Sequence, residues 1–230
     1  MTGKQLQEFR KSKNWTQAKT ANRLGLTQGY LSQLERDRRR VSNELQMKLA
    51  SLGGLDPLAL PLESADRWRK ENHADEKFAQ ALGHLGYPGF SYYRGQPTLN
   101  PAEVLVGALV QSNLETRLAE AMPWLAAKYP NMDWHWAVRE AKVNDAQNRL
   151  GFVVTLARQL ADRKGLFEAA GTLNAVEKQL EHARMEREDT LCNEKLTAAE
   201  RQWLVTYRPP QAAEWHLLTD LTAERLPYAL

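Results

Sequence analysis

The feature that most constrains the fold of this chain is a pair of short helical segments joined through a glycine. A helical pattern over residues 17–24 ends at Gly25, the residue type that most often closes a helix at its carboxyl end. Thr27 follows at an N-cap position, and Leu31 and Leu34 then repeat the apolar spacing of one helix face. The pattern predicts two short helices, a tight turn between them, and a buried face that both helices share.

The segments on either side of this pair extend the helical prediction over the first 60 residues. Leu6 and Phe9 mark an earlier helix, and Ser42 stands at the N-cap of a later one that carries Leu45 and Leu49. We therefore expect a small domain of four or five short helices at this end of the chain.

Charge is distributed unevenly along the 230 residues. Residues 1–62 hold 11 Lys and Arg against 5 Asp and Glu, whereas residues 63–230 hold 20 against 23. The first part thus carries +6 and the rest −3, which together give the overall net charge of +3. Clustered cations displace counterions from phosphates, so the asymmetry indicates a polyanion such as nucleic acid as the partner of the amino-terminal part.

The spacing of these residues resembles the Cro and phage-repressor class of helix-turn-helix domains over roughly residues 4–55. The residues that carry the resemblance are Thr16-Gln17-Ala18, Leu24-Gly25-Leu26-Thr27-Gln28 and Leu31-Ser32-Gln33-Leu34-Glu35-Arg36. The resemblance implies an all-α chain that begins with a five-helix, lambda-repressor-like domain. In that family the second helix of the motif enters the major groove of double-stranded DNA, and dimers bind half-sites about one helical turn apart.

The resemblance also implies which residues contact DNA. They are Gln17, Thr27, Gln28, Gly29, Tyr30, Ser32, Gln33, Arg36, Arg38, Arg39 and Arg40. Gln28 and Gln33 match base-reading positions, and a glutamine amide donates and accepts at once, as a bidentate pair with adenine requires. Gln17 matches a phosphate-binding position that braces Gln28.

Two pairs of residues in the motif stand apart from its base-reading glutamines. Arg10 and Glu35 match the internal ion pair of the family, which is a structural role. Gly29 removes a side chain where relatives often place a base-contacting one, and Tyr30 is bulkier than usual, so the preferred operator does not follow from the resemblance. Outside this motif, exposed glutamines and an arginine run are ordinary surface features; beside a recognition helix, we expect the arginines to contact phosphates.

The sequence predicts three parts. Residues 1–62 form the DNA-binding domain, and the glycines and prolines between residues 53 and 61 mark its edge. Residues 63–99 form a connector with a surface helix and an aromatic loop. Residues 100–230 form a larger helical domain for dimerisation or partner binding, whose start is indicated by the helix-opening pattern from Asn100 to Glu103.

The centre of the larger domain predicts one long helix with polar residues at unusual places. Asp133 stands at its N-cap, and apolar residues from Val143 to Ala161 alternate at spacings of four and three, so we expect the helix to run to about residue 162. Two interpretations of its unusual residues stay open, a structural hydrogen-bond network with aromatic core, or a surface for a partner or effector. These residues are Trp134, Trp136, Asn144, Asp145, Asn148 and Arg149.

Several function classes are not supported by the sequence. The apolar runs are far shorter than the roughly 20 residues of a membrane helix, so we expect a cytoplasmic protein without membrane contact. Cys192 is the single cysteine, and the five histidines follow no metal-ligand spacing. We expect no metal, no cofactor and no catalytic residue, and therefore no enzyme.

Three hypotheses for the function follow. The first is a homodimeric repressor that acts as the autoregulating antitoxin of a toxin-antitoxin or phage-defence operon, with a cognate toxin as partner. It draws on a second resemblance, over residues 85–225, to regulators encoded beside abortive-infection nucleotidyltransferase toxins; the residues that carry it are Ala121-Met122-Pro123-Trp124-Leu125, Asp133-Trp134, Ala141-Lys142 and Gln147-Asn148-Arg149-Leu150-Gly151-Phe152. The second is a ligand-responsive regulator with an effector pocket in the carboxy-terminal domain. The third is a phage-defence or partition adaptor that uses DNA only as an anchor.

Overall fold

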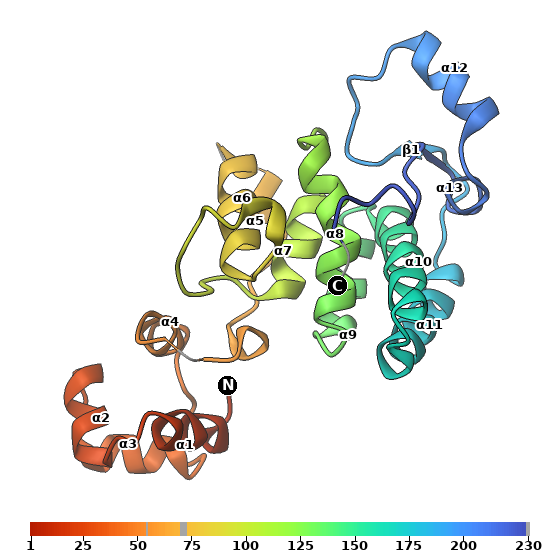
Figure 1. The fold of residues 1–230 in the computed structure, drawn as a ribbon. Coiled ribbons are helices and arrows are strands. Elements are labelled where there is room, and N and C mark those ends of the chain that lie inside the picture. Colours follow the sequence, from red (N-terminus) through yellow and green to blue (C-terminus); the bar gives the residue numbers. More distant parts are fainter. Residues whose placement is uncertain (54, 70–72, 229–230) are drawn as a thin grey trace. The chain divides into compact units, whose positions relative to one another are not determined.

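A computed structural model describes residues 1–53, 55–69 and 73–228, and almost all of their regular secondary structure is helical (Figure 1). The chain divides into two compact units. The smaller unit comprises Met1–Leu62 and Gly95–Asn100, and the larger comprises Glu63–Arg94 and Pro101–Leu230. Among the described residues, no helix has the length and apolar character needed to span a bilayer.

The smaller unit holds four α-helices and one 3₁₀ helix among its described residues: α1 (Gly3–Ser12), α2 (Gln17–Leu24), α3 (Gln28–Glu35), α4 (Asn43–Ser51) and η1 (Pro57–Ala59). The capping predictions are confirmed, because Thr27 and Ser42 each accept a backbone N–H of the helix that they open. Leu6, Leu31 and Leu49 are fully buried and form the centre of a core to which all four α-helices contribute.

The predicted connector does not form a separate body. Gly95–Asn100 packs with the smaller unit, where the side-chain amide of Asn100 donates to the carbonyl oxygens of Leu58 and Leu60 at 3.2 and 2.9 Å. Glu63–Arg94 packs with the larger unit. It carries the aromatic residues Tyr87 and Phe90, both buried, as expected for an ordered loop.

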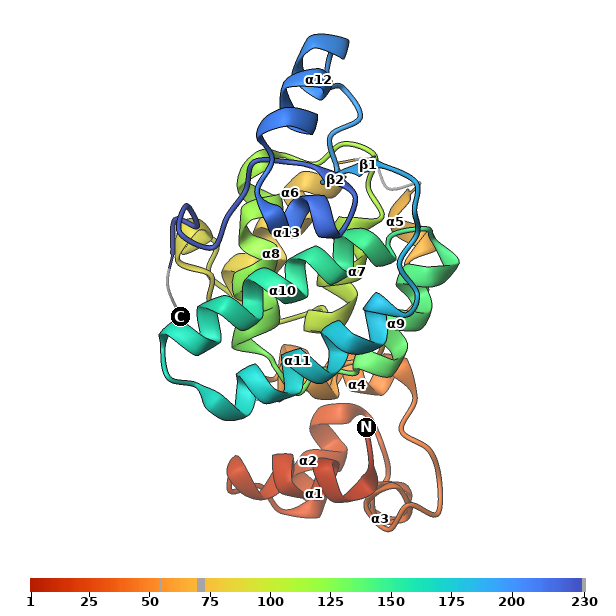
Figure 2. The same ribbon diagram turned by 90° about the vertical axis from the view of Figure 1, so that its right-hand side faces the viewer.

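The larger unit contains α5 (Asp66–Arg69), α6 (Ala74–His84), η2 (Pro88–Phe90), α7 (Pro101–Leu109), α8 (Thr116–Lys128), α9 (Trp134–Val143), α10 (Gln147–Arg163), α11 (Phe167–Glu181), α12 (Ala198–Tyr207) and α13 (Pro210–Glu214). Two short strands, β1 (Asp189–Thr190) and β2 (Leu217–Leu218), pair in parallel. Helix α10 lies at the centre and packs most extensively against α11 and α8 (Figure 2).

Trp215 packs closely against one face of α10. The spacing of apolar residues in the sequence does not predict this contact. The indole of Trp215 lies so close to Gly151 that a Cβ there would come within 2.2 Å of the ring. Its Nε1 donates to the Thr155 hydroxyl oxygen at 2.8 Å, and that hydroxyl donates to Glu177 of α11 at 2.7 Å. Glycine at position 151 therefore leaves the space that the indole occupies. The polar atoms of Trp215, Thr155 and Glu177 at this contact are hydrogen-bonded.

The prediction of one long helix from about residue 134 to 162 is wrong. The chain forms α9 and α10, with Asn144 closing α9 and Asp145 in the left-handed region at φ +57°. The Ala146 N–H returns to the carbonyl oxygen of Ala141 at 2.8 Å, which completes a Schellman-type ending. Val143, predicted to lie in the apolar seam, is 69% exposed because the chain turns directly after it.

A buried carboxylate links α5 to α7 in the larger unit. The Glu103 side chain is 2% exposed, accepts the indole N–H of Trp68 at 3.3 Å and pairs with Arg67. Burial favours the neutral form more strongly than Arg67 and Trp68 favour the charged one, and it raises the pKa of Glu103 to about 7.

Because the pKa of Glu103 is higher in the folded than in the unfolded chain, the folded state binds this proton more tightly. We expect the free energy of unfolding to fall as pH rises from about 4.5 to about 7, by about 3 kcal/mol at most. Glu103→Gln removes this contribution and flattens the profile, as measured by urea unfolding across this range. Glu8→Gln, at an exposed surface position, is the control that keeps the wild-type slope. A Glu103→Gln profile as steep as that of the wild type would assign the slope to another group.

Candidate nucleic-acid interface

The turn between α2 and α3 is built by local hydrogen bonds. Gly25 ends α2 in the left-handed region at φ +71°, and the Leu26 N–H returns to the carbonyl oxygen of Ala21 at 2.8 Å. The Thr27 hydroxyl oxygen then accepts the N–H of Tyr30 and opens α3. The two helices are therefore joined by a tight, hydrogen-bonded turn, as the sequence predicts.

Helix α3 has a buried inner face and an exposed outer face. Leu31 and Leu34 are fully buried in the core of the smaller unit. Gln28, Gly29 and Gln33 are exposed on the outer face, whose side chains are polar except for the half-buried Tyr30. A Cβ added at Gly29 would meet nothing within 4 Å, so packing within the chain does not require glycine there. This leaves the helix backbone bare and open to close approach by a ligand.

The buried carboxylate of Glu35 ties the end of α3 to the helices on its inner side. The guanidinium of Arg10 binds both oxygens of Glu35 at 2.6 and 3.1 Å and also donates to the Trp15 carbonyl oxygen at 3.1 Å. This confirms the predicted internal ion pair. Burial by itself raises the pKa of Glu35, but the hydrogen bonds from Arg10 and Gln17 outweigh it and hold that pKa below its ordinary value.

Gln17 takes part in this support. Its amide Nε2 donates to Glu35 at 2.9 Å, so the side chain braces the carboxylate at the end of α3. The resemblance implies that Gln17 binds a phosphate and braces Gln28, and both roles stay predictions. The contact between Gln17 and Glu35 is not predicted from the sequence, because the two residues lie 18 positions apart.

The turn after α3 presents four arginines on a fixed backbone. Asp37 adopts φ +54°, and the Arg38 N–H returns to the carbonyl oxygen of Gln33 at 2.9 Å. The Asp37 carboxylate accepts the Gly3 N–H at 2.5 Å and so anchors the turn to the start of α1. All four arginines are exposed, at positions Arg36, Arg38, Arg39 and Arg40.

Arg39 is coupled to the recognition helix. Its Nε donates to the Gln33 Oε1 at 3.0 Å, and its guanidinium lies 5.7 Å from the centroid of the Tyr30 ring. Arginine has only donors, so the amide must turn its oxygen toward Arg39. The NH₂ group of Gln33 and the second lone pair of its oxygen stay available for other partners.

The second group of predicted residues lies in the larger unit and is largely committed to contacts there. The side chain of Arg149 binds both oxygens of Asp189 at 2.7 and 2.9 Å and donates to the carbonyl oxygens of Leu109 and Gln111 at 3.0 and 2.8 Å. The Asn148 amide exchanges two hydrogen bonds with the backbone of Met185, each at 2.8 Å. These contacts join α10 to the segments around it.

The remaining residues of that group shape α9 and its end. Trp134 and Trp136 are buried, and the Trp134 indole donates to the Pro130 carbonyl oxygen at 2.7 Å. Asn144 is buried and donates to the carbonyl oxygen of Glu140 at 2.9 Å, whereas Asp145 is exposed at the turn. A role of these residues in binding a partner or effector stays a prediction.

Two further observations concern chemistry. The Cys192 thiol is fully buried, and burial raises its pKa to about 11, which keeps it protonated at neutral pH. No group of three or more His, Cys, Asp or Glu side chains within residues 1–53, 55–69 and 73–228 is placed to hold a metal ion.

Comparison with known proteins identifies the smaller unit. A family model described as Helix-turn-helix matches residues 6–60. These residues are a helix-turn-helix domain. The match confirms the resemblance to the Cro and phage-repressor class and supports DNA binding with a role in transcription regulation. Searches of curated proteins and of solved structures found no match.

The ion pair behind the recognition helix yields a stability prediction for the helix-turn-helix domain. Arg10→Met leaves the buried Glu35 carboxylate without its cation, so we expect the free energy of unfolding to fall by about 3–5 kcal/mol. Lys4→Met is the matched control, because Lys4 and Glu8 form an exposed pair at 4.0 Å whose loss costs less than about 1 kcal/mol. Urea unfolding of both variants measures the difference, and equal losses would contradict a supporting role for the buried pair.

Proposed function

We propose that this chain is a sequence-specific transcriptional repressor that binds double-stranded DNA as a homodimer. The observation that carries the proposal is the outer face of α3, where exposed glutamines stand beside a turn of four exposed arginines. An α-helix with its side chains is about 10–12 Å across and fits the major groove, which is about 12 Å wide.

The two kinds of residue divide the work of binding. Arg36, Arg38 and Arg40 contact phosphates and set the position of the duplex, without regard to base sequence. Gln28 and Gln33 then reach the base edges. For Gln28 no side-chain hydrogen bond within the described chain is seen, so its amide presents both donor and acceptor to adenine. Gln33, held by Arg39, presents its NH₂ group to an acceptor such as guanine O6 or N7 or thymine O4.

We expect a homodimer because a single helix-turn-helix domain is small. One helix-turn-helix domain covers a single half-site, and two-fold related half-sites about one helical turn apart double the contacts. In this proposal the larger helical unit supplies the dimer contact and a contact to another protein.

We further propose that the protein represses its own operon as the antitoxin of a toxin-antitoxin or phage-defence pair. The support is the resemblance of residues 85–225 to regulators encoded beside nucleotidyltransferase toxins. Co-purification with the product of the neighbouring gene tests this part. Failure of that product to bind, with operator binding intact, would remove the antitoxin role and leave the repressor.

A cavity favours one alternative, a ligand-responsive regulator. A cavity of about 450 Å³ lies against the turn between α9 and α10, and Asn144, Asp145, Arg149 and Arg187 contribute to its lining. Its walls are mainly polar, so an effector there would itself be polar or charged. Trp134 and Trp136, which the effector hypothesis would place in such a pocket, do not line it. Release of operator DNA on addition of a small polar metabolite would favour this function.

The repressor proposal predicts different losses for two kinds of substitution. Gln28→Ala should cost about 1–3 kcal/mol on the DNA upstream of the protein's own gene and little on scrambled DNA of equal length. Arg38→Ala should weaken both DNAs alike and lower the salt dependence by about one unit of slope. Titrations at two salt concentrations measure both effects.

The wild-type protein provides the reference for these titrations. A preference of about 10³ or more for the upstream DNA is expected of an operator-reading protein. Equal binding to both DNAs, erased by salt, would overturn sequence-specific repression.

The coupling of Arg39 to Gln33 gives a second prediction. Arg39→Met removes the donor that fixes the Gln33 amide, so we expect the base preference opposite Gln33 to relax and to include adenine. Arg40→Met, at a neighbouring exposed arginine, should lower affinity without changing base preference. Selection from a randomised duplex library measures both, and an unchanged preference in Arg39→Met would show that Arg39 does not orient Gln33 on DNA.

A further inference from the structure

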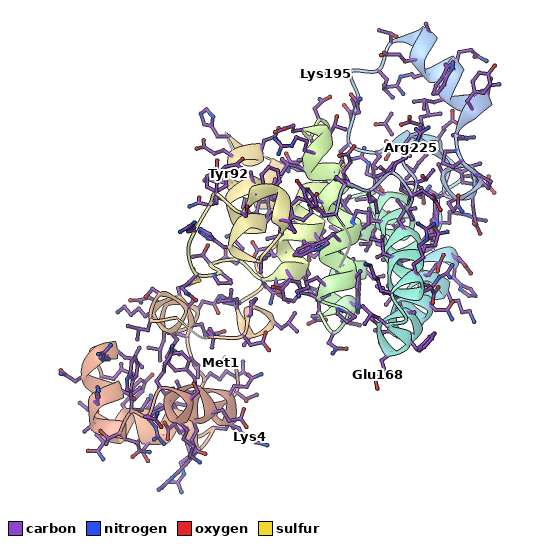
Figure 3. All side chains as sticks on the ribbon, viewed as in Figure 1. Met1, Lys4, Tyr92, Glu168, Lys195 and Arg225 are labelled. Atoms are coloured by element: carbon purple, nitrogen blue, oxygen red, sulfur yellow. The ribbon has the colours of Figure 1, made fainter. Side chains whose placement is uncertain are left out.

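The tip of the α10–α11 hairpin carries an apolar side chain that packing within the larger unit leaves exposed. Phe167 is 79% exposed, more than any other large apolar side chain among the described residues, and Leu166 beside it is 44% exposed. Figure 3 shows Glu168, the next residue, pointing into solvent from this tip. Adjacent exposed apolar side chains beside an apolar groove form a contiguous patch, and such patches mark interaction sites.

The backbone of the tip holds this side chain outward. Gly165 closes α10 in the left-handed region at φ +67°, and the Leu166 N–H returns to the carbonyl oxygen of Ala161 at 2.9 Å. The Ala170 N–H then bonds the Leu166 carbonyl oxygen at 2.9 Å and opens α11. Phe167 therefore stands on a hydrogen-bonded turn that fixes its direction.

A groove lies directly beside this knob. It has a volume of about 860 Å³ and is lined mainly by apolar surface. Ala127 and Pro130 at the end of α8 form one wall, and Ala169 and Thr172 of α11 form another. We call the groove and the knob together the corner patch, which consists of Ala127, Lys128, Pro130, Asn131, residues 164–169 and Thr172.

The corner patch is complementary to itself. A two-fold interface uses the same patch on both subunits, so each copy must offer both the inserted group and the site that receives it. Phe167 and the adjacent groove meet this condition. The charges meet it as well, because Lys128 and Lys164 border the groove together with Glu168, and a second copy brings its carboxylate to these lysines.

The other exposed aromatic cluster lacks this property. Helix α12 stands away from the body of the larger unit in both views (Figures 1 and 2), and its Trp203 and Tyr207 stack on each other at 5.2 Å. The cavity at the root of α12, about 220 Å³, is lined by Leu204 and Leu218 and not by these two rings. This helix thus offers apolar side chains without a matching groove.

Building on the dimeric repressor proposed above, we propose that a second copy of this chain docks on the corner patch, with Phe167 of each copy inserted into the groove of the other. A patch made of one hairpin tip and one helix end is smaller than a standard interface, so the dimer is of the dissociable, micromolar class. Such a dimer forms readily on an operator, where two half-sites raise the local concentration of the partner.

Sedimentation velocity of the full chain tests the proposal from about 1 to about 100 micromolar, the range in which an interface of this class dissociates. We expect Phe167→Glu to raise the dimer dissociation constant at least about tenfold, as for a central apolar anchor. Its fold is kept, because the side chain is exposed and an acidic residue is favourable in the first turn of α11. Val143→Glu, at an apolar residue of α9 that is 69% exposed, is the matched control and leaves the dissociation constant unchanged.

Disulfide trapping provides a second, positional readout. Phe167→Cys and Thr172→Cys variants are mixed and oxidised, and we expect a covalent dimer that contains one of each. The native Cys192 is fully buried and contributes no accessible thiol. A wild-type protein that stays monomeric throughout this range, or a dimer that Phe167→Glu leaves intact, would overturn the proposal; dissociation by Trp203→Glu alone would place the interface on α12.

These outcomes are independent of DNA binding. A protein that dimerises through Phe167 but does not distinguish upstream from scrambled DNA would retain the corner patch and lose the repressor function. A protein that distinguishes the two DNAs but fails the dimer tests would retain sequence reading and lose this interface.

Discussion

The buried carboxylate of Glu35 is the interaction on which the reading head depends. Its side chain is 1% exposed, and it sits at the end of α3, where Arg10 of α1 and Gln17 of α2 converge on it. A carboxylate removed from water is stable only when it is paired and hydrogen-bonded, so the three helices keep one arrangement. The outer face of α3 is free to remain polar because its orientation is fixed from the inner side.

The larger unit applies the same constraint at its centre. Arg149 at the start of α10 satisfies the carboxylate of Asp189 and two carbonyl oxygens at the end of α7. Asn148 joins the same turn of α10 to the backbone of Met185. The polar side chains of Asn148 and Arg149 thus hold α10 to the neighbouring segments of this unit. The apolar tip at Phe167 is exposed and available to a partner.

Local signals predicted the helix-turn-helix domain well. Its glycine turn, its threonine and serine caps and its apolar spacing act within a few residues, and each favours the same fold. The same reasoning failed between α9 and α10, where the apolar spacing continued across Asn144 and Asp145 although the chain turned there. Apolar periodicity does not register a residue that adopts the left-handed region, as Asp145 does at φ +57° in the Schellman-type ending of α9.

The sequence by itself determined the helical class, the second helix of the helix-turn-helix motif with its glutamines, and the concentration of positive charge beside it, because these properties belong to short stretches of chain. Tertiary structure alone decided that Gln17 donates to Glu35, that Arg39 donates to the amide oxygen of Gln33, and that Phe167 lies next to a groove. Such contacts join side chains on different helices or turns. Their geometry follows from how the helices pack, which the order of residues specifies only through the whole fold.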